Sequence, residues 1–358
     1  MTRSEEAFGV VNGAEVTAYT VENRNGYSFT VMSYGATLIS FKAPDASGNR
    51  QELTLGYNTL DPYLAGHPFL GSTVGRVANR IGAGRFTYDG RTYTLDVNEG
   101  SATLHGGSGG FHQKVWDARG FEREGQAGVI FHMVSEDGDQ GFPGTVGVTV
   151  TYVLTESNEF IIEYQAEADV DTPLNLTNHA YWNLAGAPDL RRARGESVPS
   201  DPAAGGAVGD HTLVVYGSTW LEQGEWQVPT GRLLDAAGTP NDFRAPKPIG
   251  RDITAADGYD LCYVLEPCED DLCPAASITE PTTGRRMDVL TTYPTLQFYT
   301  AEKLEATVAR NGEHWKKRDA FCVETQFHPD AVNHDNFPSI ILKSGETYQQ
   351  KTVHRFSI

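Results

Sequence analysis

Short stretches that mix β-branched and aromatic residues recur along the chain, and Gly, Pro, Asn or Asp bounds each of them. Such stretches predict strands, because branched and aromatic side chains suit a pleated surface while the bounding residues favour turns. Long stretches with the 3.6-residue period of a helix are missing, and the best short helix candidate is 60–66. The predicted strands cover residues 28–43, 146–154, 159–167, 211–217, 295–302 and 339–345.

The order of these elements predicts an all-β fold in one domain. Strands do not alternate with helices, which argues against doubly wound α/β folds and (β/α)₈ barrels. Residues 185–210 are polar and rich in Gly and Pro between two predicted strands, and we expect a surface loop there. No internal repeat or low-complexity tail divides the chain. We therefore expect a single domain over residues 1–358.

The composition supports the all-β prediction and limits the classes of molecule that the protein can bind. The chain has 38 Gly, 18 Pro, 16 Tyr and 16 Phe, as expected for many short strands joined by tight turns. The formal net charge of −19 would repel both a nucleic-acid backbone and an anionic membrane surface. We expect neither as a partner. A small neutral ligand is mildly favoured.

The apolar runs and the cysteines indicate the compartment. No window approaches the roughly 20 apolar residues of a membrane span, and the first residues lack the apolar run of a signal peptide. We therefore expect a cytoplasmic protein. The cysteines, at 262, 268, 273 and 322, show neither CxxC pairs nor a regular framework. Reduced, mostly buried thiols are the natural prediction.

The first candidate for chemistry is the stretch TLHGGSGGFHQKVW at 103–116. His105 is followed by two glycines, which would let the backbone approach a ligand closely. A histidine beside glycine in a turn is also a common hydrogen-bonded turn residue. Taken alone, the stretch is a weak signal.

A second stretch, TPLNLTNHAYWNLAG at 172–186, surrounds His179 with amide and hydroxyl side chains. These groups are Asn175, Thr177, Asn178 and Asn183. Buried polar groups need partners, so this density beside Tyr181 and Trp182 suggests a polar, aromatic-edged cleft. A sugar would supply such partners, since its hydroxyls hydrogen bond while its C–H faces pack on rings. The alternative is that Asn178 and Asn183 only cap turns.

The third stretch, DAFCVETQFHPDAVNHDNFP at 319–338, predicts a strand that carries Glu324. Glu324 would face away from Val323, toward solvent or a pocket, because side chains alternate along a strand. A solvated carboxylate is the plainer interpretation. His328 and His334 lie near two aspartates, but no recognised ligand pattern is present, and we expect no metal.

Read in order, these stretches resemble the aldose 1-epimerase (galactose mutarotase) family over nearly the whole chain. The matching stretches are YGATLISF (34–41), GSTVGRVANRIGAGRF (71–86), TLHGG (103–107), DGDQGFPG (137–144), NLTNHAYWNLAG (175–186), GYD (258–260), PTLQFYT (294–300) and CVETQFHPDAVN (322–333). The resemblance implies a large antiparallel β-supersandwich with few short helices and no cofactor or metal. Compared with the family pattern, the loop at 185–210 is longer than usual, and a longer loop would alter the rim of the pocket.

Carried over by position, the resemblance implies roles for single residues. Glu324 becomes the general base and His179 the general acid. The substrate binders become Asn79, Arg80, His105, Asp260 and Gln297. Reference pKa values of about 4.3 for Glu and about 6.5 for His make the first an ionised base at neutral pH and the second a partly protonated imidazolium. The roles of general acid and substrate binder could also be the reverse for His179 and His105.

The activity implied is interconversion of the α and β anomers of a free aldohexose such as glucose or galactose, in a monomer or weak homodimer. One alternative is a hexose-6-phosphate 1-epimerase, which would need several basic residues converging on the phosphate. Among the residues to which the resemblance gives a role, Arg80 is the only Lys or Arg. A second alternative is a non-catalytic sugar-binding or regulatory protein. The preferred aldose is left open, because it depends on fine placement of hydroxyl partners.

Overall fold

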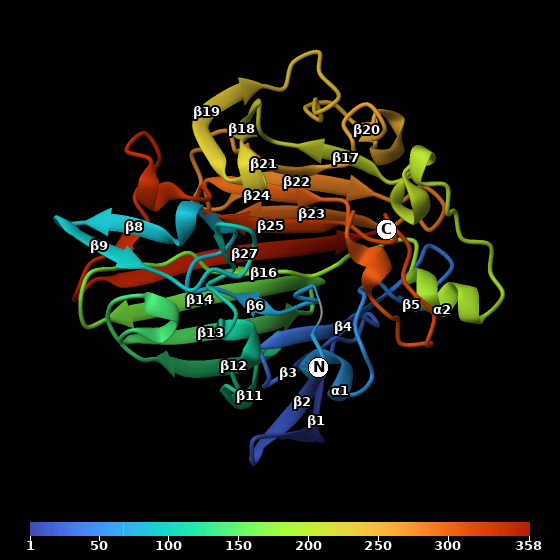
Figure 1. The fold of residues 1–358 in the computed structure, drawn as a ribbon. Helices are drawn as coiled ribbons and strands as arrows, with labels where there is room; N and C mark the ends of the chain where they lie inside the picture. The colour runs from blue at the N-terminus through green and yellow to red at the C-terminus, as the bar shows by residue number, and fades with distance from the viewer. Residues whose placement is uncertain (67) are drawn as a thin grey trace.

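A nine-stranded antiparallel sheet runs through the whole molecule in the computed structural model, which describes residues 1–66 and 68–358 (Figure 1). Its strands, in spatial order, are β11 (Asp117–Arg123), β12 (Gln126–Ser135), β13 (Val146–Thr155), β14 (Glu159–Ala168), β27 (Thr347–Ser357), β23 (Arg286–Thr291), β22 (Cys273–Thr279), β17 (Thr212–Val215) and β20 (Lys247–Pro248). The strand alternation explains its two faces. In β13, Val148, Val150 and Tyr152 are buried, while Thr149 and Thr151 between them are partly exposed.

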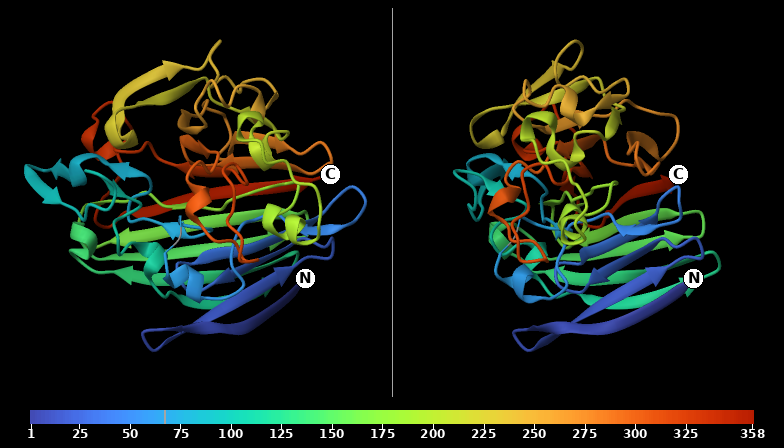
Figure 2. Two further views of the ribbon diagram at one scale, coloured as in Figure 1. Left: turned by 45° about the vertical axis from the view of Figure 1, so that its right-hand side comes forward. Right: turned by 90° about the vertical axis from the view of Figure 1, so that its right-hand side faces the viewer.

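Two five-stranded sheets cover the buried face of this large sheet (Figures 1 and 2). The first consists of β1 (Thr2–Val11), β2 (Ala14–Glu22), β3 (Ser28–Met32), β4 (Thr37–Pro44) and β5 (Arg50–Glu52). Phe41 on β4 stacks on Phe356 of β27, with ring centroids 4.5 Å apart, and Phe29 on β3 packs on Phe160 of β14 at 5.3 Å. Burial of these rings is the main force that holds the layers together. The arrangement confirms the predicted all-β fold and is the antiparallel β-supersandwich that the resemblance implies.

The second small sheet has one apolar and one polar face. Its order is β19 (Pro229–Asp235), β18 (Thr219–Gln223), β21 (Asp260–Val264), β24 (Thr295–Tyr299) and β25 (Cys322–Gln326). Leu296, Phe298 and Val323 belong to the main core. The residues between them face the other way, and one row across the strands reads Cys262, Gln297, Glu324 while the next reads Asp260, Tyr299, Cys322. Chemistry-bearing side chains are thereby collected on one face.

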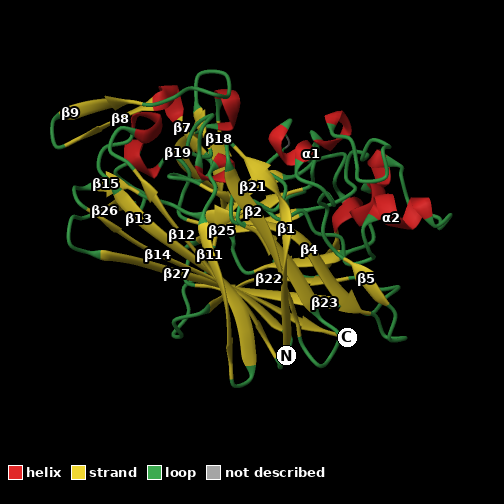
Figure 3. Cartoon of the chain, turned by 90° about the horizontal axis from the view of Figure 1, so that it is seen from below, coloured by secondary structure: helices red, strands yellow, loops and turns green. Residues whose placement is uncertain are grey.

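Short elements complete the fold and gather on one side of the strands (Figure 3). The remaining strands pair as β6 (Thr73–Val74) with β16 (Thr177–Asn178), β7 (Arg80–Ile81) with β10 (Thr103–Leu104), β8 (Arg85–Tyr88) with β9 (Arg91–Thr94), and β15 (Thr172–Pro173) with β26 (Ile341–Leu342). The α-helices are α1 (Asp61–Leu64) and α2 (Pro188–Ala193). The 3₁₀ turns are η1 (Gly82–Gly84), η2 (Phe111–Gln113), η3 (Asp139–Gly141), η4 (Pro202–Ala204), η5 (Gly206–Val208), η6 (Glu225–Gln227), η7 (Ile249–Arg251), η8 (Leu304–Ala306) and η9 (Ala331–Asn333). Within the described ranges, none of the helices has the length and apolar character needed to cross a bilayer.

The predicted elements recur with altered bounds: β13 and β14 are one residue longer than predicted, and the others are shorter or divided. The stretch 28–43 becomes two strands, β3 and β4, and 339–345 keeps only the two residues of β26. The helix predicted at 60–66 is α1. Residues 185–210, predicted as a surface loop, contain α2, η4 and η5, and Val208 is fully buried in the main core.

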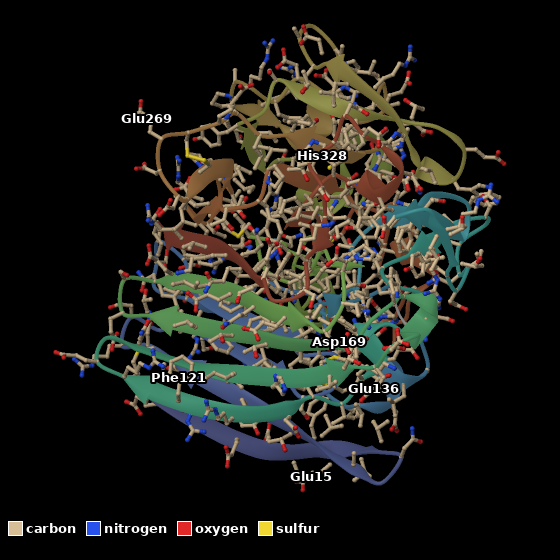
Figure 4. All side chains as sticks on the ribbon, turned by 90° about the vertical axis from the view of Figure 1, so that its left-hand side faces the viewer. Glu15, Phe121, Glu136, Asp169, Glu269 and His328 are labelled. Carbon is tan, nitrogen blue, oxygen red and sulfur yellow. A yellow bond between two sulfur atoms is a disulfide. The ribbon has the colours of Figure 1, made fainter. Side chains whose placement is uncertain are left out.

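The prediction that all cysteines are reduced is wrong. Cys268, which follows β21, and Cys273, the first residue of β22, form a disulfide, seen as a yellow bond beside Glu269 (Figure 4). Their Cα atoms are 5.6 Å apart, within the range a disulfide requires. A separation of five residues fits no CxxC template, and only the folded turn brings the two thiols together. Cys262 and Cys322 are free and buried, as predicted.

Candidate active site

Three segments far apart in sequence are joined by backbone hydrogen bonds around one pocket. β16 pairs with β6, and the bonding continues past its end, where the His179 amide donates to the Ser72 carbonyl at 2.9 Å. The Gly71 amide donates to the His179 carbonyl, also at 2.9 Å. In the same way the His105 amide donates to the Asn79 carbonyl at 2.9 Å, where β10 meets β7. The two histidines are therefore held by backbone, not by loop packing alone.

A further bridge brings His179 beside Glu324. Trp182 and Phe321 exchange two backbone hydrogen bonds, of 2.7 and 2.9 Å. This bridge lays the segment after β16 along the start of β25. The Nε2 atom of His179 then lies 3.7 Å from the Oε1 atom of Glu324.

The structure brings all seven predicted site residues into one cavity of about 160 Å³. They are Asn79, Arg80, His105, His179, Asp260, Gln297 and Glu324, and the other lining residues are Pro68, Phe69, Glu99, Leu104, Tyr181, Tyr299 and Lys303. The cavity is smaller than the roughly 300–1,000 Å³ of pockets for drug-sized molecules. Its size suits one monosaccharide ring.

His105 is fixed as a neutral hydrogen-bond donor. Its Nδ1 atom accepts a hydrogen bond from the backbone N–H of Asn79, at 3.1 Å. An N–H group can only donate, so Nδ1 carries no proton and the ring proton sits on Nε2. Burial, with His179 and Arg80 nearby, holds the pKa of His105 well below its usual range. This ring cannot become an imidazolium without losing its backbone bond.

His179 is stacked among rings and buried. Its ring lies nearly parallel to Tyr181, with centroids 5.0 Å apart, and to Phe69, at 5.9 Å. Burial lowers the pKa of His179 to about 4, while a hydrogen bond with its own backbone acts the other way. The expectation of a partly protonated free imidazolium at neutral pH is therefore wrong, because it used the value for a solvated ring.

Glu324 is buried with an oxygen left free for a ligand. Its Oε2 atom has no hydrogen-bond partner among the described residues. Burial, and then the neighbouring Asp260, raise the pKa of Glu324 well above its usual range. The prediction of a carboxylate ionised by its reference value fails for the same reason as that for His179. The two groups 3.7 Å apart are best treated as one pair that holds one proton near neutral pH.

The substrate binders implied by the resemblance form one hydrogen-bonded chain. Asn79 Nδ2 donates to Gln297 Oε1 at 3.3 Å, and Gln297 Nε2 donates to Asp260 Oδ1 at 2.6 Å. Arg80 donates from Nε to Glu99 at 2.7 Å and from Nη2 to Gln227 at 2.8 Å. A polar cluster fixed in this way presents preorganised donors and acceptors to a hydroxylated ligand.

Three residues that sequence reasoning missed complete this network. Gln227 Nε2 donates to Asp260 Oδ2 at 2.8 Å, so its amide links Asp260 to Arg80. Lys303 Nζ lies 3.1 Å from Glu99, which also pairs with Arg80. Lys303 directly follows the predicted strand at 295–302 and Glu99 shortly precedes TLHGG, but neither position shows in sequence which way its side chain points.

The asparagines around His179 are structural, which corrects the interpretation that they line a cleft. Asn175 bonds the backbone N–H and carbonyl of Phe327, and Asn178 donates to the Gly71 carbonyl at 2.6 Å. Asn183 donates to the Asp319 carbonyl at 2.9 Å. Each satisfies buried backbone groups where the segments meet. Trp182 lies in the main core, and only Tyr181 of the two aromatics lines the pocket.

Three side chains of the pocket also belong to residue types that bind metal ions. His105, His179 and Glu324 offer atoms within 4.8 Å of one another. Two atoms bound to one zinc ion at about 2.1 Å can be no more than about 4.2 Å apart, so a shift of side chains would be needed to close such a site. His334 lies 3.4 Å from Asp330, whose other oxygen accepts from the Gly82 amide. That aspartate is part of the framework beside β7.

Gly106 lies against backbone, where the sequence suggested a close approach to a ligand. It has a φ of +83°, and a Cβ atom there would come within 2.2 Å of the Gly75 carbonyl oxygen. We expect Gly106→Ala to destabilise the protein by roughly 2 to 4 kcal/mol, since it adds a backbone clash to the strain of positive φ. Gly125→Ala is the matched control, with a φ of +74° and nothing within 4 Å. Thermal unfolding should show the larger loss for Gly106→Ala; equal losses would contradict the packing described.

The architecture and the pocket are those of a β-sandwich epimerase acting on carbohydrates, and comparisons with known proteins agree. The family model described as aldose 1-epimerase matches residues 17–355. A galactose mutarotase from Rattus norvegicus is 37% identical over 92% of this chain and 90% of its own length. An aldose 1-epimerase from Escherichia coli is 35% identical over 96% of each chain. The solved structure of an aldose epimerase homologue from C. elegans is 31% identical, covers 94% of this chain and 98% of its own, and superposes with a TM-score of 0.84.

The chain belongs to the aldose 1-epimerase family.

Proposed function

We propose that this protein is a mutarotase that interconverts the α and β anomers of a free aldohexose such as glucose or galactose. The observation that carries the proposal is the buried pair of Glu324 and His179, 3.7 Å apart in a cavity the size of one sugar ring. Residues of a single chain build the cavity, so a monomer or weak homodimer suffices. A cytoplasmic location remains part of the proposal.

The reaction uses the one proton of the pair. With Glu324 ionised and His179 protonated, Glu324 takes the proton of the anomeric hydroxyl O1. The C1–O5 bond breaks as the C1=O1 bond forms, and Nε2 of His179 gives its proton to O5. After rotation about C1–C2, O5–H attacks the other face of C1, returns its proton to His179, and Glu324 protonates O1. Positioned acid and base each contribute roughly 10²- to 10⁴-fold in rate.

The charges of the pocket support a neutral sugar over a sugar phosphate. Among the described lining residues, the Lys and Arg side chains are Arg80 and Lys303, and both pair with Glu99. Asp260 and Glu324 add further carboxyl groups to the same cavity. A phosphate would have to displace Glu99 and approach these carboxyl groups, which is unfavourable. We expect activity on free hexose and little on the 6-phosphate.

The pH profile should reflect the shared proton. The pKa of His179 is lowered to about 4, so the pair of Glu324 and His179 gains a second proton only in acid. The pKa values of the neighbouring His105 and His112 are also lowered, so these rings stay neutral over the same range. The raised pKa of Glu324 delays loss of the last proton on the alkaline side. We therefore expect kcat/KM to stay level through about pH 6.5, the usual value for histidine, and to fall toward pH 4. An acid limb centred near 6.5 would contradict the burial of His179.

Polarimetry of freshly dissolved α-D-galactose and α-D-glucose tests the proposed function. We expect equilibration much faster than in buffer alone, and no comparable effect on the anomers of glucose 6-phosphate. Binding of hexose without any acceleration would favour a sugar-binding protein instead. Faster reaction with the phosphate would favour the hexose-6-phosphate epimerase.

A further inference from the structure

The Nδ1 atom of His179 faces a buried thiol that the reaction described above does not use. The Sγ atom of Cys322 lies 3.6 Å from Nδ1, within hydrogen-bond range for sulfur. Cys322 and Glu324 occupy neighbouring rows on the same face of β25. One strand thus presents the thiol to one ring nitrogen of His179 and the carboxyl group to the other.

The proton cycle dictates which ring nitrogen must keep its proton. Nε2 faces Glu324 and has to give up and regain a proton in each turnover. If the neutral ring held its proton on Nε2 alone, giving that proton to O5 would leave an imidazolate, which a buried site disfavours strongly. If the proton stays on Nδ1, the neutral ring is the product of proton donation and Nε2 is free to take the proton back.

We propose that Cys322 is a positioning residue: its sulfur accepts a hydrogen bond from Nδ1–H of His179 and so keeps Nε2 as the nitrogen that exchanges protons with the sugar. The inference rests on the proposed mutarotase function. The partner of one ring nitrogen generally fixes the state of the other.

The surroundings of the thiol agree with this role. Burial, with Glu324 and Asp260 nearby, raises the pKa of the Cys322 thiol well above its usual range, so the sulfur stays neutral. A neutral acceptor orients the ring without stabilising the imidazolium as strongly as a carboxylate would.

Nitrogen NMR of histidine-labelled protein tests the proposal directly. In the free wild-type enzyme, near neutral pH, we expect His179 to carry its proton on Nδ1, with its signals assigned by their loss in His179→Asn. Cys322→Ala should move proton population to Nε2 and lower kcat about tenfold, the size expected for one neutral hydrogen bond, with KM within about twofold. Cys322→Ser keeps an acceptor and should retain the wild-type tautomer and most of kcat.

Cys262→Ala is the matched control, because Cys262 is the other free buried cysteine of the described residues and lies on β21, which β24 separates from β25. It should change neither the tautomer nor kcat. A wild-type ring protonated on Nε2 would overturn the proposal, as would an unchanged tautomer and rate in Cys322→Ala. If Cys322→Ala fails to fold, the wild-type spectrum and Cys322→Ser decide. Since the tautomer is read without substrate, its failure is distinct from failure of the proposed function.

Discussion

Glu324→Gln is expected to lower kcat by roughly 10²- to 10⁴-fold, which corresponds to about 3 to 5 kcal/mol in the activation barrier. The amide keeps the shape of the carboxyl group and removes its basicity. Because Glu324 Oε2 has no protein partner to lose among the described residues, the fold should be unaffected. The measurement is polarimetry at saturating hexose, together with the unfolding temperature.

A matched control separates the base from a general effect of losing a charge. Glu163 lies on β14 and pairs at the surface with Lys351, 2.6 Å away. Glu163→Gln should keep kcat within about twofold, because exposed ion pairs contribute little. Retention of more than about a tenth of wild-type kcat in a folded Glu324→Gln protein would remove Glu324 from the role of base.

His179→Asn is expected to reduce kcat by a similar factor, roughly 10²- to 10⁴-fold, with a smaller change in KM. His105→Asn should act mainly on KM, because the neutral His105 ring can only donate a hydrogen bond from Nε2. Asparagine suits this comparison, since position 105 has a φ of +51° and asparagine tolerates that backbone region.

The sequence does not decide which of the two histidines is the general acid and which binds the substrate. The two variants distinguish these roles. Steady-state polarimetry of both gives kcat and KM separately. If His105→Asn lost kcat while His179→Asn kept it, the general acid would be misassigned. The backbone bond to Nδ1 of His105 is the structural reason to expect the opposite result.

The position of the site could be predicted from the sequence, because the site residues lie in motifs that resemble those of one family and follow one another in the same order. The positions of His105, His179 and Glu324 followed from three stretches and their resemblance to one family, and the strand alternation gave the facing of Glu324. The β-supersandwich followed from the strand pattern and the same resemblance.

Protonation and local partners could not be predicted, because they depend on tertiary burial. Reference pKa values failed for His179 and Glu324, whose charged forms both lose hydration in the pocket. The polar residues around His179 in the sequence did not show that the Asn178 side chain donates its hydrogen bond to a backbone carbonyl and not to a ligand. The Cys268–Cys273 disulfide likewise depends on a turn that spacing alone does not specify.

In the proposed mechanism one carboxyl group and one imidazole act on the same hexose, at O1 and O5. A crystal structure of Glu324→Gln with bound galactose tests this arrangement, because the variant should bind the sugar without interconverting its anomers. We expect O1 within hydrogen-bond distance of the side chain at 324 and O5 within that distance of His179 Nε2. A sugar bound in this pocket with C1 directed away from both groups would rule out the proposed acid–base pair.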